Sequence, residues 1–485
     1  MGVAELDILL GPWSAGRGPL HVKLTHALRK AMERRVLAPG ARLPSERELA
    51  RQLVVSRSTV VAAYDALRAE GWLESRQGSG THVAPLRHAR GVGAAEPLNP
   101  VFRSLLEDDP DDVLSLACAI NPAHPLLADA VVAAAAGAPS GVLASDGYQP
   151  LGVPELRAKL AELHTGVELP TAPEQIVVTT GAQQAINLCA AAFVRPGDRV
   201  VVESPGFPGT LDAFGAAATR FVSVDVDEGG VDADGVRDAV ERDAPALTFL
   251  MPSFHNPTGT LLERRRRAEL AELALVSGVP LVEDNALEHI PLAVDPPPAV
   301  AAHGPPDAPI LTIGSFSKLA WGGLRVGWIR GPAPLIRRLG DVKARTDLGT
   351  PMFDQAVAAW LLDRVDRMRE DRRAELRSSL ELVTGLLRRD LPEWQWREPD
   401  GGPALWIRLP GGANSTQYAQ VALRHGVEVI PGDVMSPTGD HVDYFRLPYT
   451  LPHDMLETVM RRLAEAWGAY ASGSTAALAA PAVVV

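Results

Sequence analysis

The chain has 485 residues, enough for two or three domains, and its 46% apolar and 22% charged residues are typical of a chain with buried cores rather than a disordered one. Its two cysteines, Cys118 and Cys189, exclude a disulfide scaffold and a cysteine-rich zinc module, and they favour a reducing compartment. No stretch approaches the roughly 20 apolar residues that span a bilayer, and the start of the chain lacks a secretory pattern. We therefore expect a cytoplasmic protein that does not enter a membrane.

The formal net charge of −12 is divided unevenly along the chain. Residues 1–84 contain 12 Lys and Arg against 8 Asp and Glu, so this segment carries +4 and the remaining 401 residues carry −16. Such asymmetry indicates a small basic module joined to a large acidic one. A small positive excess is also common on solvated surfaces, so the charge alone does not identify a nucleic-acid binder.

The basic segment carries the pattern of a helix-turn-helix. Apolar residues recur at helical spacing over residues 22–38. Ser45, followed three residues later by Glu48, fits a capping box and predicts the start of a second helix. After a tight turn at residues 54–55, Ser56 can cap a third helix. Two helices joined by so short a turn predict a helix-turn-helix, whose second helix presents its N-terminal residues to the base edges of DNA.

A wing follows this motif. Gly71 ends the third helix, and residues 72–83 indicate a two-stranded ribbon whose Gly-Ser-Gly tip can approach a phosphate. We expect Arg57 to read a guanine or to hold a phosphate. The alternative is a small helical domain that pairs with another protein. The polar cluster at the helix N-terminus, the wing and the positive charge favour DNA.

The segment from Leu37 to Val83, LAPGARLPSERELARQLVVSRSTVVAAYDALRAEGWLESRQGSGTHV, resembles the winged-helix domain of the GntR regulator family. The resemblance implies operator binding, with Arg47 and Arg57 among the DNA contacts. The predicted DNA-binding residues are Ser45, Arg47, Ser56, Arg57, Ser58, Thr59, Gly78, Ser79 and Gly80.

A change of composition marks the end of this module. Residues 85–112 are rich in Pro and Gly, close on an acidic cluster and show no sustained period, so we interpret them as a linker. We therefore divide the chain into a DNA-binding domain at residues 1–84, the linker, a large domain at residues 113–470 and a disordered tail at residues 471–485. In the large domain, short apolar runs such as IVVTT, RVVVE and PLVED alternate with helical patterns. This alternation predicts a mostly parallel sheet covered on both faces by helices.

Four segments of the large domain carry chemistry. Lys318, in SFSK after an apolar strand, can form an imine with an aldehyde if burial and positive neighbours lower its pKa, although most lysines are solvated surface charges. Arg325 can grip a phosphate with its two-pronged guanidinium. TTGAQQAI, at residues 179–186, places a glycine between a strand and a helix, where backbone N–H groups point at an anion. Asp284 ends an apolar strand and would need a cationic partner if buried, and a pyridinium nitrogen is one such cation.

Together these segments resemble the fold-type I, pyridoxal-phosphate-dependent aminotransferases over residues 114–466. HNPTG, at residues 255–259, matches the family's Asn-Pro-x-Gly turn. The 28 residues from Asn256 to Asp284 and the 34 residues from Asp284 to Lys318 also fit the family. The resemblance implies a three-layer α/β/α domain on a mostly parallel sheet, with a small C-terminal α+β subdomain, joined to an α-helical DNA-binding domain with a small β wing.

The same resemblance implies a cofactor and the residues that hold it. Lys318 would bind pyridoxal 5'-phosphate (PLP) as a Schiff base, Asp284 would pair with the pyridinium nitrogen, and Asn256 would bond the phenolic oxygen. Phe207 would stack on the ring, and Arg446 would grip the carboxylate of a substrate or effector. The phosphate would be held by Ala182, Gln183, Ser315, Ser317 and Arg325.

One position departs from the family pattern. The family usually has a tyrosine two residues after the position of Asp284, and its hydroxyl shares the phenolic oxygen with Asn256. Ala286 stands there in this chain. The lost hydrogen bond is worth about 1–3 kcal/mol if the oxygen is left buried and unsatisfied. We therefore expect at most slow transamination.

A GntR-like winged helix joined to an aminotransferase-like domain resembles the MocR/GabR class of bacterial transcriptional regulators. The resemblance implies a PLP-dependent regulator that binds double-stranded operator DNA and responds to an amine, an amino acid or PLP. It also implies a homodimer, head-to-tail and domain-swapped, in which Tyr148 reaches the partner's cofactor. Three alternatives are a competent aminotransferase that carries a DNA-binding domain, a regulator that senses PLP itself for vitamin B6 metabolism, and a cofactor-free DNA-binding scaffold.

Three further features carry structural expectations. The run Arg264–Arg267 predicts a solvated helix face, with docking of the DNA-binding domain as the alternative. Trp394, Trp396 and Trp406 predict the core of the small subdomain. The 12 histidines show no metal-ligand spacing, so we predict no metal.

Overall fold

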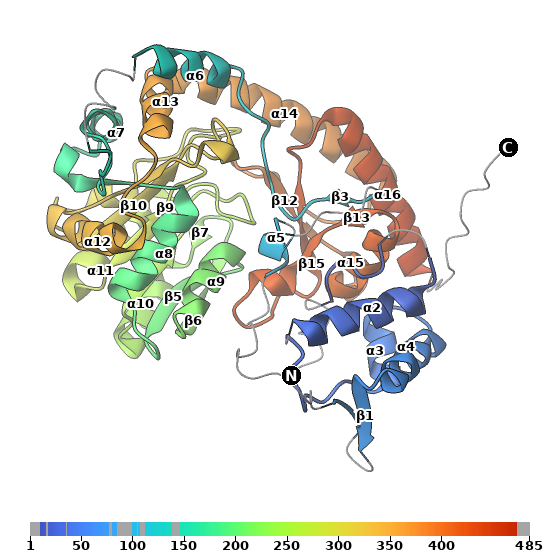
Figure 1. Cartoon of the computed structure of the whole chain (residues 1–485). Coiled ribbons are helices and arrows are strands. Elements are labelled where there is room, and N and C mark those ends of the chain that lie inside the picture. Colours follow the sequence, from blue (N-terminus) through green and yellow to red (C-terminus); the bar gives the residue numbers. More distant parts are fainter. Residues whose placement is uncertain are drawn as a thin grey trace.

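The computed structural model describes residues 10–15, 18–34, 36–76, 80–84, 99–103, 105–106, 112–137 and 146–472. Figure 1 shows a sheet domain, a small subdomain beside it, and a helical domain beneath the small subdomain. The helical domain comes from the N-terminal part of the chain, and the small subdomain comes mostly from its C-terminal part. The predictions that fall outside the described residues include Gly78 and Ser79 of the wing, residues 85–98, 104 and 107–111 of the linker, and residues 473–485 of the tail.

The N-terminal domain is a winged helix-turn-helix, as predicted. The helix predicted over residues 22–38, α2 (Leu20–Glu33), ends earlier than the apolar pattern suggests, because Leu37 turns back into the core and donates its N–H to Ala31 O at 3.1 Å. The two predicted caps are present: Ser45 Oγ accepts from the N–H of Glu48 at 3.3 Å, and Ser56 Oγ accepts from the N–H of Thr59 at 3.1 Å. The elements are α2 (Leu20–Glu33), α3 (Glu46–Gln52), α4 (Arg57–Ala69), β1 (Leu73–Arg76) and β2 (Gly80–Val83).

The large domain is built on one eight-stranded sheet with the order β4-β11-β10-β9-β8-β5-β6-β7. The neighbours β10, β9, β8, β5 and β6 run parallel, whereas β11 and β7 pair antiparallel with their neighbours. Apolar runs fill these strands because both faces of the sheet are covered. The strands are β4 (Ile176–Thr179), β5 (Arg199–Ser204), β6 (Arg220–Asp227), β7 (Gly230–Val231), β8 (Leu247–Leu250), β9 (Leu281–Asp284), β10 (Ile310–Ser315) and β11 (Gly327–Arg330).

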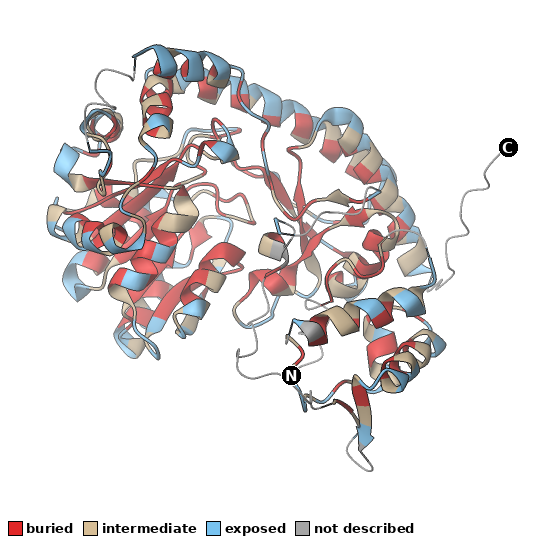
Figure 2. Ribbon diagram, in the orientation of Figure 1, coloured by how far each residue is buried: buried red, intermediate tan, exposed pale blue. Residues whose placement is uncertain are grey.

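Helices cover this sheet and complete three layers. In Figure 2 the central strands of the sheet are buried almost throughout, while the helices are buried mainly on the side that faces the sheet. In β6, near one edge of the sheet, Val224 is the one buried residue. The predicted α/β/α architecture is therefore confirmed. The helices are α6 (Leu126–Gly137), α7 (Pro154–Gly166), α8 (Ala182–Phe193), α9 (Pro208–Ala216), α10 (Ala233–Asp243), α11 (Arg264–Ser277), α12 (Ala333–Thr346) and α13 (Met352–Leu362), with 3-10 turns η1 (Pro173–Gln175), η2 (Val300–His303) and η3 (Gly322–Leu324).

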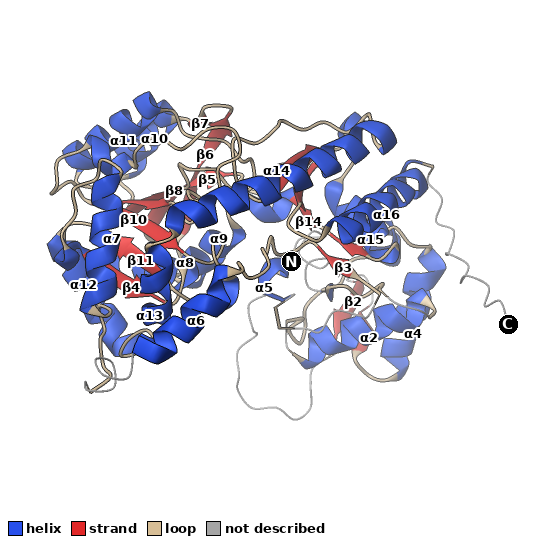
Figure 3. Ribbon diagram, turned by 90° about the horizontal axis from the view of Figure 1, so that it is seen from above, coloured by secondary structure: helices blue, strands red, loops and turns tan. Residues whose placement is uncertain are grey.

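The small subdomain packs three helices on short strands. α14 runs from the sheet domain to this subdomain, as the view from above shows (Figure 3). One sheet has the order β12-β15-β14, and β13 pairs in parallel with β3. The elements are β3 (Leu114–Ser115), α14 (Val365–Asp390), β12 (Ala404–Arg408), η4 (Pro410–Gly412), α15 (Ser415–Arg424), β13 (Val427–Glu428), β14 (Ile430–Pro431), η5 (Gly432–Met435), β15 (Tyr444–Pro448) and α16 (His453–Ala471).

Aromatic residues build the core of this subdomain. Trp394 is buried and meets the rings of Phe445 and Trp467 edge-on, with centroids 5.3 and 5.7 Å apart. Trp396 and Trp406 pack against the cores but stay partly exposed. The prediction of a tryptophan core holds fully for Trp394 alone.

Two expectations need correction. The predicted linker contains a helical turn, α5 (Pro100–Arg103), because Val101 supplies an apolar anchor that is buried against Ala117. The run Arg264–Arg267 is not a uniformly solvated face, because Arg267 is fully buried and its guanidinium satisfies the carbonyl of Pro252 at 2.7 Å. None of the described helices is long and apolar enough to cross a lipid bilayer.

Candidate cofactor and effector site

The predicted site residues gather at the carboxyl ends of neighbouring parallel strands. Lys318 follows β10, Asp284 ends β9, and Asn256 lies in the loop after β8. Open α/β sheets bind their ligands at this edge. Arg446 reaches the site from β15, so the site joins the sheet domain to the small subdomain.

Lys318 is partly buried in this site. Its Nζ donates to Ala119 O at 2.6 Å. Burial lowers the pKa of Lys318 to about 8; the Cys118 thiol opposes this shift, and the charges of Arg446 and Arg325 add to it. An amine with this pKa has an appreciable neutral fraction near neutral pH, as a nucleophilic lysine requires.

Asp284 is a buried carboxyl at the base of the site. It is 2% exposed, and the N–H of Ala286 donates to its Oδ1 at 2.9 Å. Burial raises the pKa of Asp284 to about 6, and the hydrogen bond from Ala286 partly offsets this effect. A buried carboxylate is costly without a cation, so Asp284 is suited to a protonated ring nitrogen.

Arg325 forms one wall of the predicted phosphate site. Its Nη2 donates to Thr180 O, directly before the start of α8. A Cβ on Gly181 would lie 2.8 Å from this nitrogen, and Gly181 has a φ of +91°, so only glycine fits here. Ala182 then begins α8, whose first N–H groups can bind an anion.

The remaining residues of the predicted phosphate and ring site lie close together in two pairs. The hydroxyls of Ser315 and Ser317 are 3.0 Å apart at the end of β10. Gln183 donates its Nε2 to Gly209 O at 3.0 Å. A Cβ on Gly209 would lie 2.4 Å from both the Gln183 amide oxygen and the Phe207 ring, so these two side chains border one small space.

Arg446 is a buried cation that reaches the site from β15 of the small subdomain. Its Nη1 donates to Asn256 Oδ1 at 3.4 Å, and its Nη2 donates to Ala117 O. Its Nε is buried with no hydrogen-bond partner among the described residues. Burial lowers the pKa of Arg446 to about 10, which still leaves it charged at neutral pH. A desolvated guanidinium with a spare N–H is suited to a carboxylate.

The predicted DNA-reading residues meet at the start of α4. Ser56 Oγ, which caps the helix, lies 2.8 Å from both Ser58 Oγ and Thr59 Oγ1. Arg57, the first residue of the helix, is exposed beside them. The other described residues of the predicted DNA face are also exposed: Ser45, Arg47 and Gly80.

Comparison with known proteins identifies both parts of the chain. The family model for aminotransferase class I and II matches residues 121–463, and the model for bacterial regulatory proteins of the gntR family matches residues 20–83. YisV of Bacillus subtilis, which carries the name uncharacterized HTH-type transcriptional regulator, is 30% identical over 94% of this chain and 98% of its own. The probable rhizopine catabolism regulatory protein MocR of Rhizobium meliloti is 28% identical over 85% of this chain and 86% of its own. The chain belongs to the MocR-type regulators.

Solved aminotransferases share the fold of the MocR-type large domain. LysN, an alpha-aminoadipate aminotransferase from Thermus thermophilus complexed with N-(5'-phosphopyridoxyl)-L-leucine, superposes with a TM-score of 0.68. It is 29% identical and covers 77% of this chain and 95% of its own. The predictions of fold class, of PLP as cofactor and of a PLP-dependent transcriptional regulator are confirmed.

The residues of this MocR-type site fit PLP. Lys318 offers an amine of lowered pKa, Asp284 offers a buried carboxyl that needs a cation, and Gly181 leaves room for an anion between α8 and Arg325. Bound there, PLP supplies an aldehyde for amines and a ring that takes up electrons.

Three residues near the site were missed by the motifs. Asn121 donates Nδ2 to Lys318 O at 2.6 Å and fixes the backbone of the lysine. Cys118 lies close enough to Lys318 and Arg446 to affect both pKa values. Glu203 is buried near Asp284, and burial raises the pKa of Glu203 to about 8. For Glu203 alone the sequence gives a signal, because a carboxylate inside the apolar run RVVVES is unusual.

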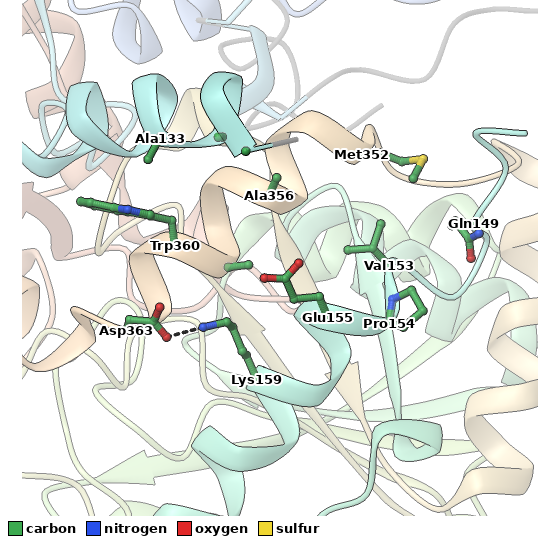
Figure 4. A pocket seen from close by; sticks show the side chains of 13 residues that line it. Ala133, Gln149, Val153, Pro154, Glu155, Lys159, Met352, Ala356, Trp360 and Asp363 are labelled. Carbon is green, nitrogen blue, oxygen red and sulfur yellow. Dashed lines mark hydrogen bonds and ion pairs between the residues drawn. The ribbon is translucent and has the colours of Figure 1, made fainter. Parts of the chain in front are cut away.

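A separate hollow of about 450 Å³ lies between α6, α7 and α13 (Figure 4). Trp360 and Met352 border it, and Lys159 pairs with Asp363 at one side. None of the predicted cofactor, effector or DNA-binding residues is among its lining residues.

Proposed function

We propose that this MocR-type regulator binds PLP through Lys318 and senses a small amine or amino acid at the same site. Arg446 would hold the carboxylate of this effector. The observation that carries the proposal is the buried Nε of Arg446, which has no partner among the described residues and belongs to the same site as Lys318. Effector binding would shift the balance between two states of the large domain and so change operator affinity, by as much as its affinities for the two states differ.

The individual roles follow from the chemistry of each group. Asp284 would keep the ring nitrogen protonated, Asn256 would donate to the phenolic oxygen, and Phe207 would stack on the ring. The phosphate would be held by Ala182, Gln183, Ser315, Ser317 and Arg325. Ala286 brings no hydroxyl to the ring, which favours ligand sensing over rapid turnover.

The DNA-binding half would act on double-stranded operator DNA in the cytoplasm. Arg57 would contact a guanine or a phosphate, and the neighbouring hydroxyls of Ser56, Ser58 and Thr59 would contact the backbone or base edges. Arg47 and Ser45, at the start of α3, and the wing would hold further phosphates.

The proposed working form is a head-to-tail, domain-swapped homodimer, in which the DNA-binding domain would make with α15 of the partner subunit the contact that it makes with α15 within this chain. Large apolar side chains are exposed on the segments that border the site, and a partner subunit would cover them: Ile120, Tyr148, Trp321, Leu348 and Phe353. We call this set the rim patch. Asn121, next to Ile120, donates to Lys318 O and so links the segment of Ile120 to the segment that carries Trp321. The backbone of Gly349, next to Leu348, lies against the backbone of Gln149, next to Tyr148. The hollow of Figure 4, lined by Gln149 and Met352, adjoins the rim patch.

The first test is fluorescence anisotropy with DNA from upstream of the protein's own gene, with and without PLP, across a salt series. Tight, salt-sensitive binding that changes with PLP would support the proposal. Tight binding that ignores PLP would move the search to amines and amino acids added to the PLP-loaded protein. Absence of specific binding in every condition, combined with rapid turnover of an ordinary amino acid, would make the protein an enzyme instead.

Arg446→Ala separates two kinds of effector. If the effector is an amino acid, the variant should lose the response while it keeps PLP and operator binding. If the response to PLP alone survives in Arg446→Ala, the protein senses PLP itself and the carboxylate part of the proposal is wrong.

A further inference from the structure

The DNA-binding domain docks on one helix of the small subdomain. Trp13 donates Nε1 to Gln420 Oε1 of α15 at 3.0 Å, in a buried hydrogen bond across 407 residues of sequence. Arg424, the last residue of α15, donates Nη1 to Leu53 O at 3.1 Å. These two hydrogen bonds, which we call the docking contact, tie the N-terminal segment and the end of α3 to the same helix.

The docking contact lies directly before the recognition helix. Leu53 is the C-cap of α3, Val54 follows it, and Ser56 caps α4. Val54 has a φ of +50°, a strained conformation for a β-branched residue, and its side chain packs against the main apolar core of the large domain. The turn that sets the direction of α4 is therefore held from outside its own domain.

The same C-terminal end of α15 that carries Arg424 continues into β13, which pairs with β3 before the chain enters the PLP site. After α15, Gly426 accepts the N–H of Leu114 at 2.9 Å, and β13 then pairs with β3. Arg462 of α16 donates to both Gly426 O and Asp112 O, at 2.9 and 3.0 Å. Ser115 donates its hydroxyl to the carboxylate of Glu428. The start of the large domain and the end of α15 thus form one fixed unit.

This unit continues into the PLP site itself. Two residues beyond β3, Ala117 accepts from the guanidinium of Arg446, and Ala119 accepts from Lys318 Nζ. Both carbonyls belong to the segment that β3 anchors. A ligand that takes the amine of Lys318 or the guanidinium of Arg446 competes with these carbonyls for the same donors.

We infer that the docking contact on α15 transmits occupation of the site by PLP to the recognition helix, through the Ala117–Ala119 segment and the β3–β13 pair. The inference rests on the proposed function, because it requires that PLP and operator DNA bind to the same chain. It assigns α15 as the surface that the DNA-binding domain recognises.

The test compares operator affinity with and without PLP in variants of the docking contact. Trp13→Phe removes the indole N–H while it keeps an aromatic ring in the core, and Arg424→Gln removes the donor to Leu53. Trp467→Phe and Arg461→Gln are matched controls on the same subdomain, because their donors bind Glu393 and Glu465 and not the DNA-binding domain. The wild type and both controls should show a PLP-dependent change of about fivefold or more, a usual size for allosteric coupling. In both docking variants the ratio of the two affinities should approach one, while the visible absorbance of bound PLP stays unchanged.

The outcomes separate the inference from the proposed function. If the wild type does not bind the DNA, the proposed function fails. If it binds DNA but ignores PLP, or if the docking variants respond to PLP as strongly as the controls, the inference is wrong and DNA binding stands. Circular dichroism and thermal unfolding check the fold, and the Trp13→Phe and Arg424→Gln variants must agree, since a folding defect at one position would not reproduce uncoupling at the other.

Discussion

At the scale of single residues, the ε-amine of Lys318 gives PLP uptake a pH dependence. Its pKa is about 8, because burial disfavours the ammonium form and the charges of Arg446 and Arg325 add to this effect against the opposing Cys118. Only the neutral amine attacks an aldehyde, so the rate of PLP uptake should rise as pH increases through about 8 and level off above it. The measurement is the growth of visible absorbance after PLP is mixed with PLP-free protein. Lys318→Ala should abolish the absorbance.

Arg446→Gln tests the cause of this lowered pKa. Loss of the positive charge should stabilise the ammonium form and move the inflection of the uptake profile to higher pH. An inflection that stays in place or moves to lower pH would contradict the assigned neighbour effect. Arg461→Gln, an exposed arginine on α16, is the control that should leave the profile unchanged.

Asp284 should act in opposite directions on stability and on PLP affinity. Its pKa in the folded chain is about 6, above the ordinary 3.8, so the PLP-free fold loses stability as pH rises through about 6. Asp284→Asn should therefore stabilise the PLP-free protein above that pH, by up to roughly 3 kcal/mol, and have little effect below pH about 4. The same change should weaken PLP binding by roughly 2–5 kcal/mol, because the ring nitrogen loses its charged partner. Thermal unfolding measures the stability of the PLP-free protein, and PLP titration measures the affinity for PLP. If Asp284→Asn lowered both the stability and the affinity, the role assigned to Asp284 would be wrong.

The candidate site residues that sequence reasoning selected are those whose chemistry depends on a local pattern. Lys318, Asp284 and Arg325 each follow a strand or a glycine turn, and the structure places them at one edge of the sheet. Cys118 and Asn121 were not found, because nothing in their neighbourhood indicates that the chain passes across Lys318. Their position depends on the pairing of β3 with β13, which joins Leu114 to Val427 across the length of the large domain.

At the scale of elements, the N-terminus of α4 separates stability from DNA recognition. Ser56 caps the helix through the N–H of Thr59, whereas Arg57 is exposed. Ser56→Ala should cost about 1 kcal/mol of stability in the DNA-binding domain. Arg57→Gln should leave stability unchanged and weaken operator binding by about 1–3 kcal/mol if it reads a base. Thermal unfolding and anisotropy measure the two effects.

The salt dependence distinguishes two roles for Arg57. A phosphate contact predicts that Arg57→Gln lowers the slope of log affinity against log salt by about one and weakens all sequences alike. A base contact predicts relaxed specificity at one operator position. An Arg57→Gln protein with unchanged affinity and slope would remove Arg57 from the interface.

The sequence predicted the starts of α3 and α4, but it predicted neither the end of α2 nor the presence of α5. The hydroxyl caps at Ser45 and Ser56 are local signals, and both are present. α2 ends at Glu33 rather than near residue 38, because Leu37 is buried in the core. Likewise, α5 forms inside a Pro- and Gly-rich segment because Val101 is buried against Ala117 from the large domain. Tertiary packing determines where α2 ends and that α5 forms, and such packing between distant segments produces no periodic pattern in the sequence.

At the scale of the whole molecule, the two-part organisation was visible in charge and pattern, but the position of the DNA-binding domain was not. The hydrogen bond between Trp13 and Gln420 depends on packing between residues at opposite ends of the chain. Neither residue belongs to a motif. The surface that joins the two parts therefore required the structure.

The proposed homodimer makes a testable prediction at the exposed rim patch. Phe353 is 42% exposed, and its burial by a partner subunit would remove apolar surface from water and so favour the proposed dimer. Phe353→Glu should therefore shift sedimentation from dimer towards monomer, because a carboxylate would be desolvated in the interface. Val276→Glu is the control, since Val276 is 78% exposed on α11, outside the rim patch. A dimer also predicts an operator with two half-sites about one helical turn of DNA, or a multiple of it, apart. The Phe353→Glu monomer should then protect a single half-site with reduced affinity, whereas a variant that sediments and footprints like the wild type would place the dimer interface elsewhere.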